Sequence, residues 1–350
     1  MRKTAAKLLT AAALATSVAT VFSGTAVADP AAGVTPAAQD IVGAGSDTTQ
    51  AVLNQLSTAY NATLTDPNAP RLYSWDAIGS SPITPKTGAG TITRPNGSGA
   101  GINALNANTS TTLDFARSSR GPVSGSTGDP ATDDFVAMAK DAVAWAAPNN
   151  GHAPANLTTQ NLKDIYTCNV TNWTQIDPTL TNATIKPFLP QKDSGTRAFF
   201  LKAIGSGTSV TPGSCVIQGT QENQGSDPAL ADLDAVVPYS VAHYIGQVYF
   251  NQGSGADVQG PLTIRSVDGT APVDVPNQKI SDAFAASSYA RVVYNVIRDA
   301  EWTGSDAHAT ALQNIFGNGG FICSSAGATV LQSYGFLPLQ GFDCGSSIHS

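Results

Sequence analysis

Three short segments of this chain place glycine beside serine or threonine, between a strand-like run and the start of a helical pattern. They are Gly45-Ser46-Asp47-Thr48-Thr49, Gly97-Ser98-Gly99 and Asp193-Ser194-Gly195-Thr196. Glycine lets the backbone approach another group closely, and a helix start leaves N–H groups without partners inside the helix. A strand–turn–helix unit that recurs along a chain favours an α/β fold.

Strands and helices alternate through the rest of the chain as well. Strand-like runs lie at 40–45, 113–116, 141–146, 185–189, 236–239 and 291–297, and helical patterns lie at 157–166, 307–316 and 326–334. Ser46 and Asp47 favour a helix N-cap, because their side-chain oxygens can accept from the first turn. Strands that alternate with helices of about 10 residues predict mostly parallel sheets.

The first 28 residues have the pattern of a cleaved export signal. Arg2, Lys3 and Lys7 precede the apolar run Leu8–Phe22, and an A-x-A cleavage site ends at Ala28. We therefore expect a secreted or periplasmic protein, with residues 29–39 as an Ala- and Pro-rich linker. No cysteine follows the cleavage site directly, so no lipid anchor is expected, and no other segment predicts membrane insertion.

The charge balance excludes several classes of partner. Only 12% of residues are charged and the net charge is −7, which becomes −10 when the three basic residues of the signal are removed. Nucleic-acid binding depends on many lysines and arginines, so we expect none here. Any anion site in such a chain must depend on local geometry rather than on long-range attraction.

Four cysteines, Cys168, Cys215, Cys323 and Cys344, lie after the signal. An even number in an exported protein predicts two disulfides, for which three pairings are possible. We favour Cys168–Cys215 and Cys323–Cys344, because each pair stays within one region of the chain. The histidines do not cluster with the cysteines in the sequence, so neither a metal site nor any cofactor is expected.

The three Gly-Ser turns together predict an anion site. One such turn is most simply an ordinary helix cap, but three at strand ends of an α/β fold can converge on one ligand. Basic residues lie beside the turns, since Arg117 and Arg120 follow a strand while Lys192 and Arg197 flank the third turn. Arginine suits oxyanions because its planar guanidinium donates two hydrogen bonds at once.

Five segments give the chain a specific resemblance. They are Gly43–Thr48, Gly97–Gly101, Leu157–Trp173, Lys192–Phe200 and Ser333–Leu339. In this order they resemble motifs of the PstS-like phosphate-binding branch of the type 2 periplasmic solute-binding proteins. The most specific are KDSGTRAFF, similar to the family's D-G-S-G-T anion loop, and the helix ending in IYTCNVTNW.

The resemblance implies two α/β lobes, each a mixed, mostly parallel sheet flanked by helices, with a ligand cleft between them. Lobe one is expected at 40–125 and 255–350, and lobe two at 126–254. The implied function is capture of a small oxyanion, most simply inorganic phosphate, for an ABC-type permease, by a monomer without enzymatic activity. The candidate ligand-binding residues are Asp47, Thr48, Ser98, Gly99, Ser118, Ser119, Arg120, Asp193, Ser194, Gly195, Thr196 and Arg197.

The chain departs from the family pattern at two places. Family members carry an aspartate within the region that is 113–122 here, where it accepts a proton from the ligand, but the strand end in this region reads Arg117-Ser118-Ser119-Arg120 and holds no carboxylate. They also carry an arginine just before the anion loop, where this chain has Gln191 and Lys192. We hypothesise that Asp47 takes the acceptor role, which would favour a protonated oxyanion over sulfate.

Two other classes of function stay open. The chain could be a secreted binding or adhesion protein that has lost or altered its anion ligand, as the two departures allow. It could also hydrolyse phosphate esters weakly, although it has no G-x-S-x-G sequence and no histidine near the three turns.

Overall fold

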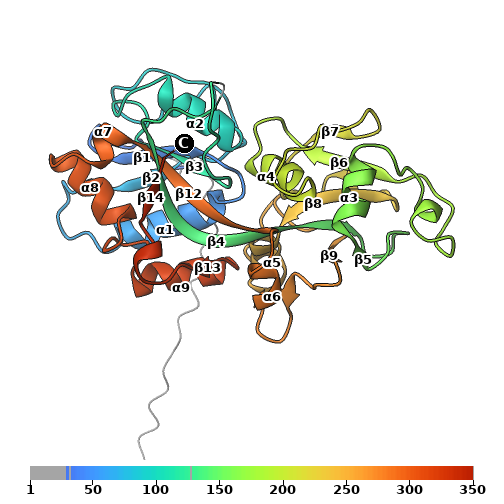
Figure 1. Ribbon diagram of the computed structural model, residues 1–350. Helices are drawn as coiled ribbons and strands as arrows, with labels where there is room; N and C mark the ends of the chain where they lie inside the picture. The colour runs from blue at the N-terminus through green and yellow to red at the C-terminus, as the bar shows by residue number, and fades with distance from the viewer. Residues whose placement is uncertain (1–28, 31–32, 127, 350) are drawn as a thin grey trace, which may run out of the picture.

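Two α/β halves joined by long strands make up the protein (Figure 1). The computed structural model describes residues 29–30, 33–126 and 128–349. The expected signal peptide, residues 1–28, lies outside the described residues, as do residues 31–32 of the expected linker. Among the helices of the described part, none has the length and apolar character needed to span a bilayer.

The described residues form the following strands and helices. The strands are β1 (Ile41–Gly45), β2 (Leu72–Ser74), β3 (Phe115–Ser118), β4 (Asp133–Pro148), β5 (Asn156–Leu157), β6 (Lys186–Pro190), β7 (Ile217–Thr220), β8 (Ala235–Ser240), β9 (Leu262–Val267), β10 (Val273–Asp274), β11 (Lys279–Ile280), β12 (Ala290–Arg298), β13 (Leu337–Pro338) and β14 (Ser347–Ile348). The helices are α1 (Gln50–Asn61), α2 (Ser98–Asn106), α3 (Thr159–Tyr166), α4 (Gly195–Ile204), α5 (Val241–Tyr249), α6 (Asp282–Ala285), α7 (Asp299–Trp302), α8 (Ala307–Phe316) and α9 (Ser325–Ser333), with short 3-10 turns η1 (Trp173–Gln175), η2 (Pro228–Ala231) and η3 (Gly341–Asp343).

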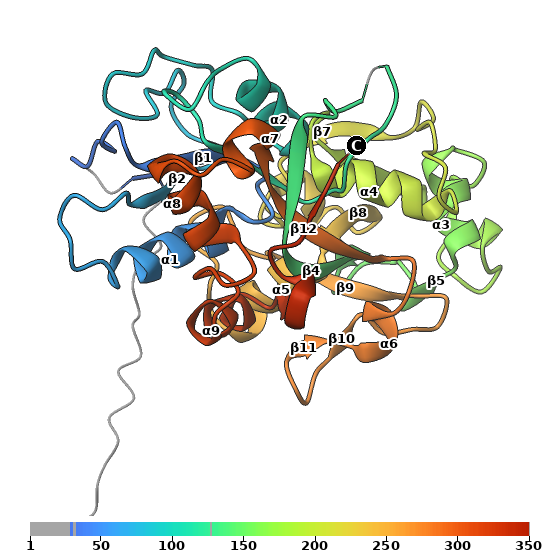
Figure 2. The same ribbon diagram turned by 60° about the vertical axis from the view of Figure 1, so that its left-hand side comes forward.

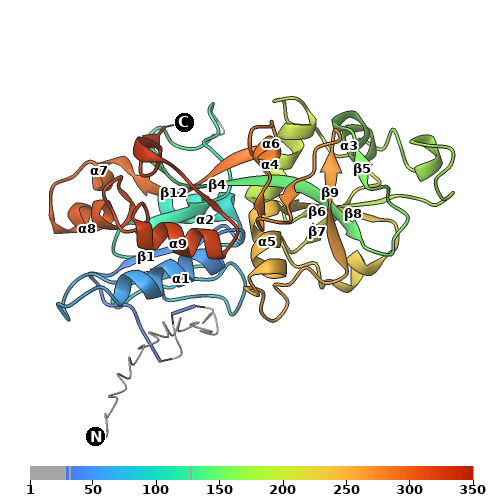
Figure 3. The same cartoon turned by 90° about the horizontal axis from the view of Figure 1, so that it is seen from below.

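Parallel strands form the centre of each half. In the first half β1 pairs with β2 and β3, and every residue of β1 is buried, as expected for a strand covered on both faces. In the second half β6 pairs in parallel with β8 and β7. Helices α1 and α9 lie together along one face of the first half (Figure 3). The alternation in the sequence therefore predicted the sheet type of both centres.

The strand β4 connects the halves. It is 16 residues long and runs antiparallel to β12, which lies alongside it (Figure 2). The first part of β4 also pairs with β13 and β14, whereas its last part pairs with β8 and β9. One continuous strand thus belongs to the sheets of both halves, and the sequence revealed only its second part, at 141–146.

The pairing of β4 bears on where the lobes divide. The expected lobe one includes residues 255–350, yet β9 lies in this segment and pairs with the last part of β4 and with β5. We propose that lobe two extends through β9 to the start of β12, and that lobe one resumes within β12. This proposal assigns each strand to the half whose sheet it joins.

The first helix begins later than the sequence suggests. α1 starts at Gln50 with Thr49 as its N-cap, and no side chain caps it, so the expected caps Ser46 and Asp47 are wrong. Residues 46–49 form a turn in which Gln50 N donates to Asp47 O at 3.0 Å. The carboxylate of Asp47 is not free to cap, because it accepts hydrogen bonds from the other half of the protein.

Two disulfides close the loops that the sequence favoured. Cys168 and Cys215 are joined, with a sequence separation of 47, and Cys323 and Cys344 are joined, with a separation of 21. Both predicted pairings are confirmed. The first fixes the end of α3 to the segment before β7, and the second fixes the start of α9 to the segment before β14.

Candidate functional site

The three Gly-Ser turns meet where the two halves face one another. α4 begins at Gly195, and a Cβ atom at this position would lie 2.3 Å from Ser98 Oγ and 2.4 Å from Ser119 Oγ. Ser119 N donates to Ser98 Oγ at 3.0 Å, and the two hydroxyl oxygens are 3.3 Å apart. Only glycine at position 195 allows the start of α4 to approach these serines. The structure thus brings Ser98, Ser119 and Gly195 together, and their contact with a ligand stays a prediction.

A second contact aligns the same helices through the backbone. Gly99 N, in the first turn of α2, donates to Asp193 O at 3.0 Å. Gly97 has φ 108°, and a Cβ there would lie 2.4 Å from Asp193 O, so this close approach also needs glycine. The side chain of Asp193 is exposed. Asp193 thus aligns the two helix starts with its carbonyl group, while Ser194 caps α4 by accepting from Arg197 N at 3.0 Å.

Two buried threonines make a further contact between the halves. Thr48 Oγ1 and Thr196 Oγ1 share a hydrogen bond of 3.1 Å. Thr48 Oγ1 also donates to Glu222 Oε1, and Thr196 Oγ1 accepts from Arg291 Nη2 at 2.8 Å. A chain of polar side chains therefore runs from the first turn to β12 across the junction.

Arg291 is the cation of this cluster, and the sequence analysis missed it. It lies on β12 with its side chain 2% exposed, and its Nε and Nη2 donate to Asp141 Oδ2 at 3.0 and 2.8 Å. Its guanidinium lies 5.6 Å from the ring centroid of Phe199. Its Nη1 is buried and has no hydrogen-bond partner among the described residues. A buried guanidinium with an unused donor is a group that an anion would satisfy.

Two carboxylates lie beside the same threonines. Asp47 accepts from Gln221 Nε2 at 2.9 Å and from Asn223 Nδ2 at 3.2 Å. Burial, and then the negative charges of Glu222 and Asp257, raise the pKa of Asp47 to about 8. Glu222 is also buried, and in the described part of the chain its Oε2 has no hydrogen-bond partner. Both oxygens of Asp47 are thus engaged, whereas Glu222 keeps one acceptor unused.

His243, on α5, connects the first Gly-Ser turn to the second half of the protein. His243 Nδ1 donates to Thr48 O at 3.1 Å, and His243 Nε2 donates to Asp257 Oδ1 at 2.6 Å. Burial opposes a charge on this ring, but the Asp257 carboxylate and its hydrogen bond outweigh that effect and raise the pKa of His243 to about 9. Both ring nitrogens act as donors, which fits a protonated imidazole.

The arginines that the sequence singled out have hydrogen-bond partners within the protein. Arg120 donates to both oxygens of Asp129, at 2.6 and 2.8 Å. Arg197 donates to Pro190 O at 2.9 Å. Arg117 is buried and donates to Ser46 O at 2.9 Å, so it stabilises the backbone of the first Gly-Ser turn. Ser118 Oγ donates to Arg120 O at 2.8 Å and helps to shape this strand end. Direct ligand contacts by Arg120 and Arg197 stay predictions.

The residues that sequence reasoning missed left weak signals. Glu222 is one of only two glutamates among 25 acidic residues, and it stands in the polar run Gln221–Gln224 after a strand. Arg291 opens a strand that is otherwise largely apolar. Neither signal says that the two side chains meet Thr48 and Thr196, because that depends on how the halves pack.

The fold is similar to known proteins. A model of the PBP superfamily domain matches residues 30–235, more than half of the chain. An ABC-type phosphate transport receptor from Vibrio cholerae is 17% identical and has a TM-score of 0.56, with the match covering 85% of this chain and 99% of that one. A putative phosphate ABC transporter substrate-binding protein with bound phosphate, from Clostridium perfringens, is 19% identical and also has a TM-score of 0.56, with coverage of 86% and 100%. None of the curated proteins matches the sequence. The structural similarity confirms the expected two-lobe α/β fold.

Proposed function

The chain belongs to the PBP superfamily, and from this premise we propose that it binds inorganic phosphate between its two lobes. The observation that carries the proposal is the buried guanidinium of Arg291, whose Nη1 has no partner in the described part of the chain and whose Nη2 contacts Thr196. Burying a charged group with an unused donor is costly unless a partner fills the place. A small oxyanion would supply that partner.

Hydrogen-bond donors from both lobes surround the proposed phosphate position. The hydroxyls of Thr48, Ser98 and Ser119 belong to the first lobe, and Thr196 and the first-turn N–H groups of α4 belong to the second. In the structure these hydroxyls contact one another: Thr48 and Thr196 Oγ1 are 3.1 Å apart, and Ser98 and Ser119 Oγ are 3.3 Å apart. Phosphate would enter as the lobes separate, replace these contacts by hydrogen bonds to its own oxygens, and be enclosed when the lobes close again.

We propose that Glu222, rather than Asp47, accepts a proton from the ligand. Asp47 already accepts two hydrogen bonds, whereas Glu222 Oε2 has no partner among the described residues. Phosphate carries a proton at neutral pH and can donate it to a carboxylate in a hydrogen bond, but sulfate cannot. An unpaired carboxylate would therefore exclude sulfate by repulsion while it accepts phosphate.

A role in phosphate uptake would fit the proposed ligand. The proteins from Vibrio cholerae and Clostridium perfringens are named as components of ABC-type phosphate transport. We propose that this chain is likewise exported, after cleavage near Ala28, and delivers phosphate to an ABC permease. It would act as a monomer without a lipid anchor, and it would change no covalent bond of its ligand.

Titration calorimetry of phosphate-free protein tests the proposal. We expect saturable binding of one phosphate per chain and much weaker binding of sulfate. Thr196→Val keeps the shape of the side chain but removes a hydrogen bond of about 1.5 kcal/mol, so phosphate should bind about tenfold more weakly. Thr329→Val is the matched control, because Thr329 is exposed on α9 and donates only to Ser325 O.

Three outcomes would contradict the proposal. Absence of phosphate binding at millimolar concentration would favour the alternative of a secreted binding or adhesion protein. Equal phosphate affinity of the wild type and Thr196→Val would place the ligand outside this cluster. Release of phosphate from an ester would reveal the weak hydrolase instead.

A further inference from the structure

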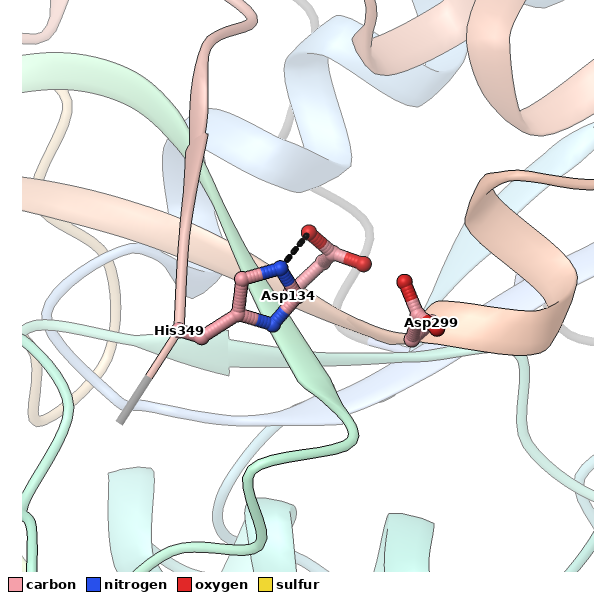
Figure 4. Close-up of side chains that lie close together, drawn as sticks. All are labelled: Asp134, Asp299 and His349. Atoms are coloured by element: carbon pink, nitrogen blue, oxygen red, sulfur yellow. Dashed lines mark ion pairs between the residues drawn. The ribbon is translucent and has the colours of Figure 1, made fainter.

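Three potential metal ligands lie together at the outer end of β4, outside the proposed phosphate site. They are Asp134 on β4, Asp299 at the start of α7 and His349 just after β14 (Figure 4). The ligand atoms of all three lie within 4.8 Å of one another. The sequence could not predict this group, because its members are far apart along the chain.

Strand register explains why these side chains share one face. β4 pairs Phe135 with Ile348 on one side and Asp134 with Ile297 on the other. His349 therefore continues the ladder beside Asp134, and Asp299 follows Ile297 by two residues, which returns it to the same face. The arrangement is thus built into the sheet rather than produced by a loose surface loop.

The central carboxylate has an unused oxygen. The side chain of Asp134 is 2% exposed, and its Oδ1 lies 3.4 Å from His349 Nε2. Its Oδ2 is buried and has no hydrogen-bond partner among the residues that the structure describes. In Figure 4 this second oxygen points toward the carboxylate of Asp299. Two carboxylates that face one another need a proton or a cation between them.

We propose that Asp134, Asp299 and His349 bind a divalent cation of the zinc type. Imidazole nitrogen together with carboxylate oxygen suits zinc, whose ligands lie at about 2.0–2.2 Å. Two such ligands at a tetrahedral angle are roughly 3.4 Å apart, which is the distance between His349 Nε2 and Asp134 Oδ1. Water would complete the coordination, since His349 is half exposed.

The cation would join three separate segments. β14 pairs with β4 over only two residues, and α7 follows β12 directly. A metal ion bound by one residue from each segment would hold β14 and the start of α7 against β4. It would act as a structural clip on lobe one, independent of the proposed phosphate site.

Calorimetry with zinc chloride on untagged protein that has been stripped with EDTA tests the proposal. We expect one zinc ion per chain, and a rise in melting temperature with zinc. His349→Ala removes an exposed ligand, so the variant should fold normally and bind zinc at least tenfold more weakly. Asp134→Asn should show the same loss, and phosphate binding should stay unchanged in both variants.

His152→Ala is the matched control. His152 forms a similar pair with one carboxylate, with Nδ1 2.9 Å from Asp234 Oδ1, but among the described residues it belongs to no such group of three. This variant should bind zinc like the wild type. Three results would overturn the proposal: no saturable zinc binding, unchanged binding by His349→Ala, or saturation by calcium but not by zinc.

Discussion

Replacing Gly195 by alanine tests most directly how the two lobes meet. Its added Cβ would lie 2.3 Å from Ser98 Oγ and 2.4 Å from Ser119 Oγ. Normal contacts are about 3.5 Å, so the start of α4 must move by about 1 Å. Folding of the helix itself should not suffer, because alanine favours a helix more than glycine by up to about 1 kcal/mol.

The expected effect is on ligand affinity. A shift of this size at the junction would remove the hydrogen bonds from Ser98 and Ser119 to the proposed phosphate. Each bond to a charged ligand contributes about 1.5 kcal/mol at the low end, so the loss is about 3 kcal/mol. That corresponds to roughly 100-fold weaker binding of phosphate.

Calorimetry with phosphate, together with thermal unfolding followed by circular dichroism, measures both effects. Gly90→Ala is the control, because a Cβ at Gly90 would meet nothing within 4 Å. Phosphate binding by Gly195→Ala within threefold of the wild type would refute the reasoning that this contact must close around the ligand. A collapse of the melting temperature would show instead that the contact supports folding.

Three further outcomes can be measured on the same protein. In the folded state Asp47 keeps its proton up to a pH of about 8, because its pKa is raised to that value. The unfolded chain releases this proton above the ordinary pKa of 3.8. Asp47 therefore makes the free energy of unfolding fall as the pH rises between these two values. Asp47→Asn should therefore make the loss of melting temperature between pH 5 and pH 8 smaller, and an unchanged slope would contradict the raised pKa. The Cys168–Cys215 disulfide closes a loop with a sequence separation of 47 and so reduces the conformational entropy of the unfolded chain. Its removal should lower the free energy of unfolding by about 4 kcal/mol in urea titrations. A loss under about 1 kcal/mol would argue against this entropic explanation. Glu222→Gln should reduce the preference for phosphate over sulfate by at least tenfold, since about 1.4 kcal/mol of repulsion disappears, and an unchanged preference would exclude Glu222 as the proton acceptor.

The sequence predicted the features that depend on local patterns. The strand ends and the starts of α2 and α4 follow from short runs in which glycine and hydroxyl residues stand between apolar segments. The disulfides followed from proximity along the chain. These features need no knowledge of how the lobes pack.

The electrostatic part of the site could not be predicted in the same way. Arg291 meets Thr196 across 95 positions, and Thr48 meets Glu222 across 174. Nothing local distinguishes Arg291 from a surface arginine, whereas Arg120 has local signs of anion binding but pairs with Asp129. Which cation is buried is decided by the packing of β12 against β4, and the sequence pattern does not contain that information.

The shared strand β4 has a mechanical consequence. A hinge made of flexible loops would let each lobe turn freely and unfold by itself. Here sixteen residues of one hydrogen-bonded strand extend through both sheets, so any rotation of the lobes must twist a ladder that is also held by β12. The register irregularity between Val293 and Tyr294 lies near its middle, where such a twist meets least resistance. The two lobes should therefore open through a small angle, and they should unfold together in one cooperative transition.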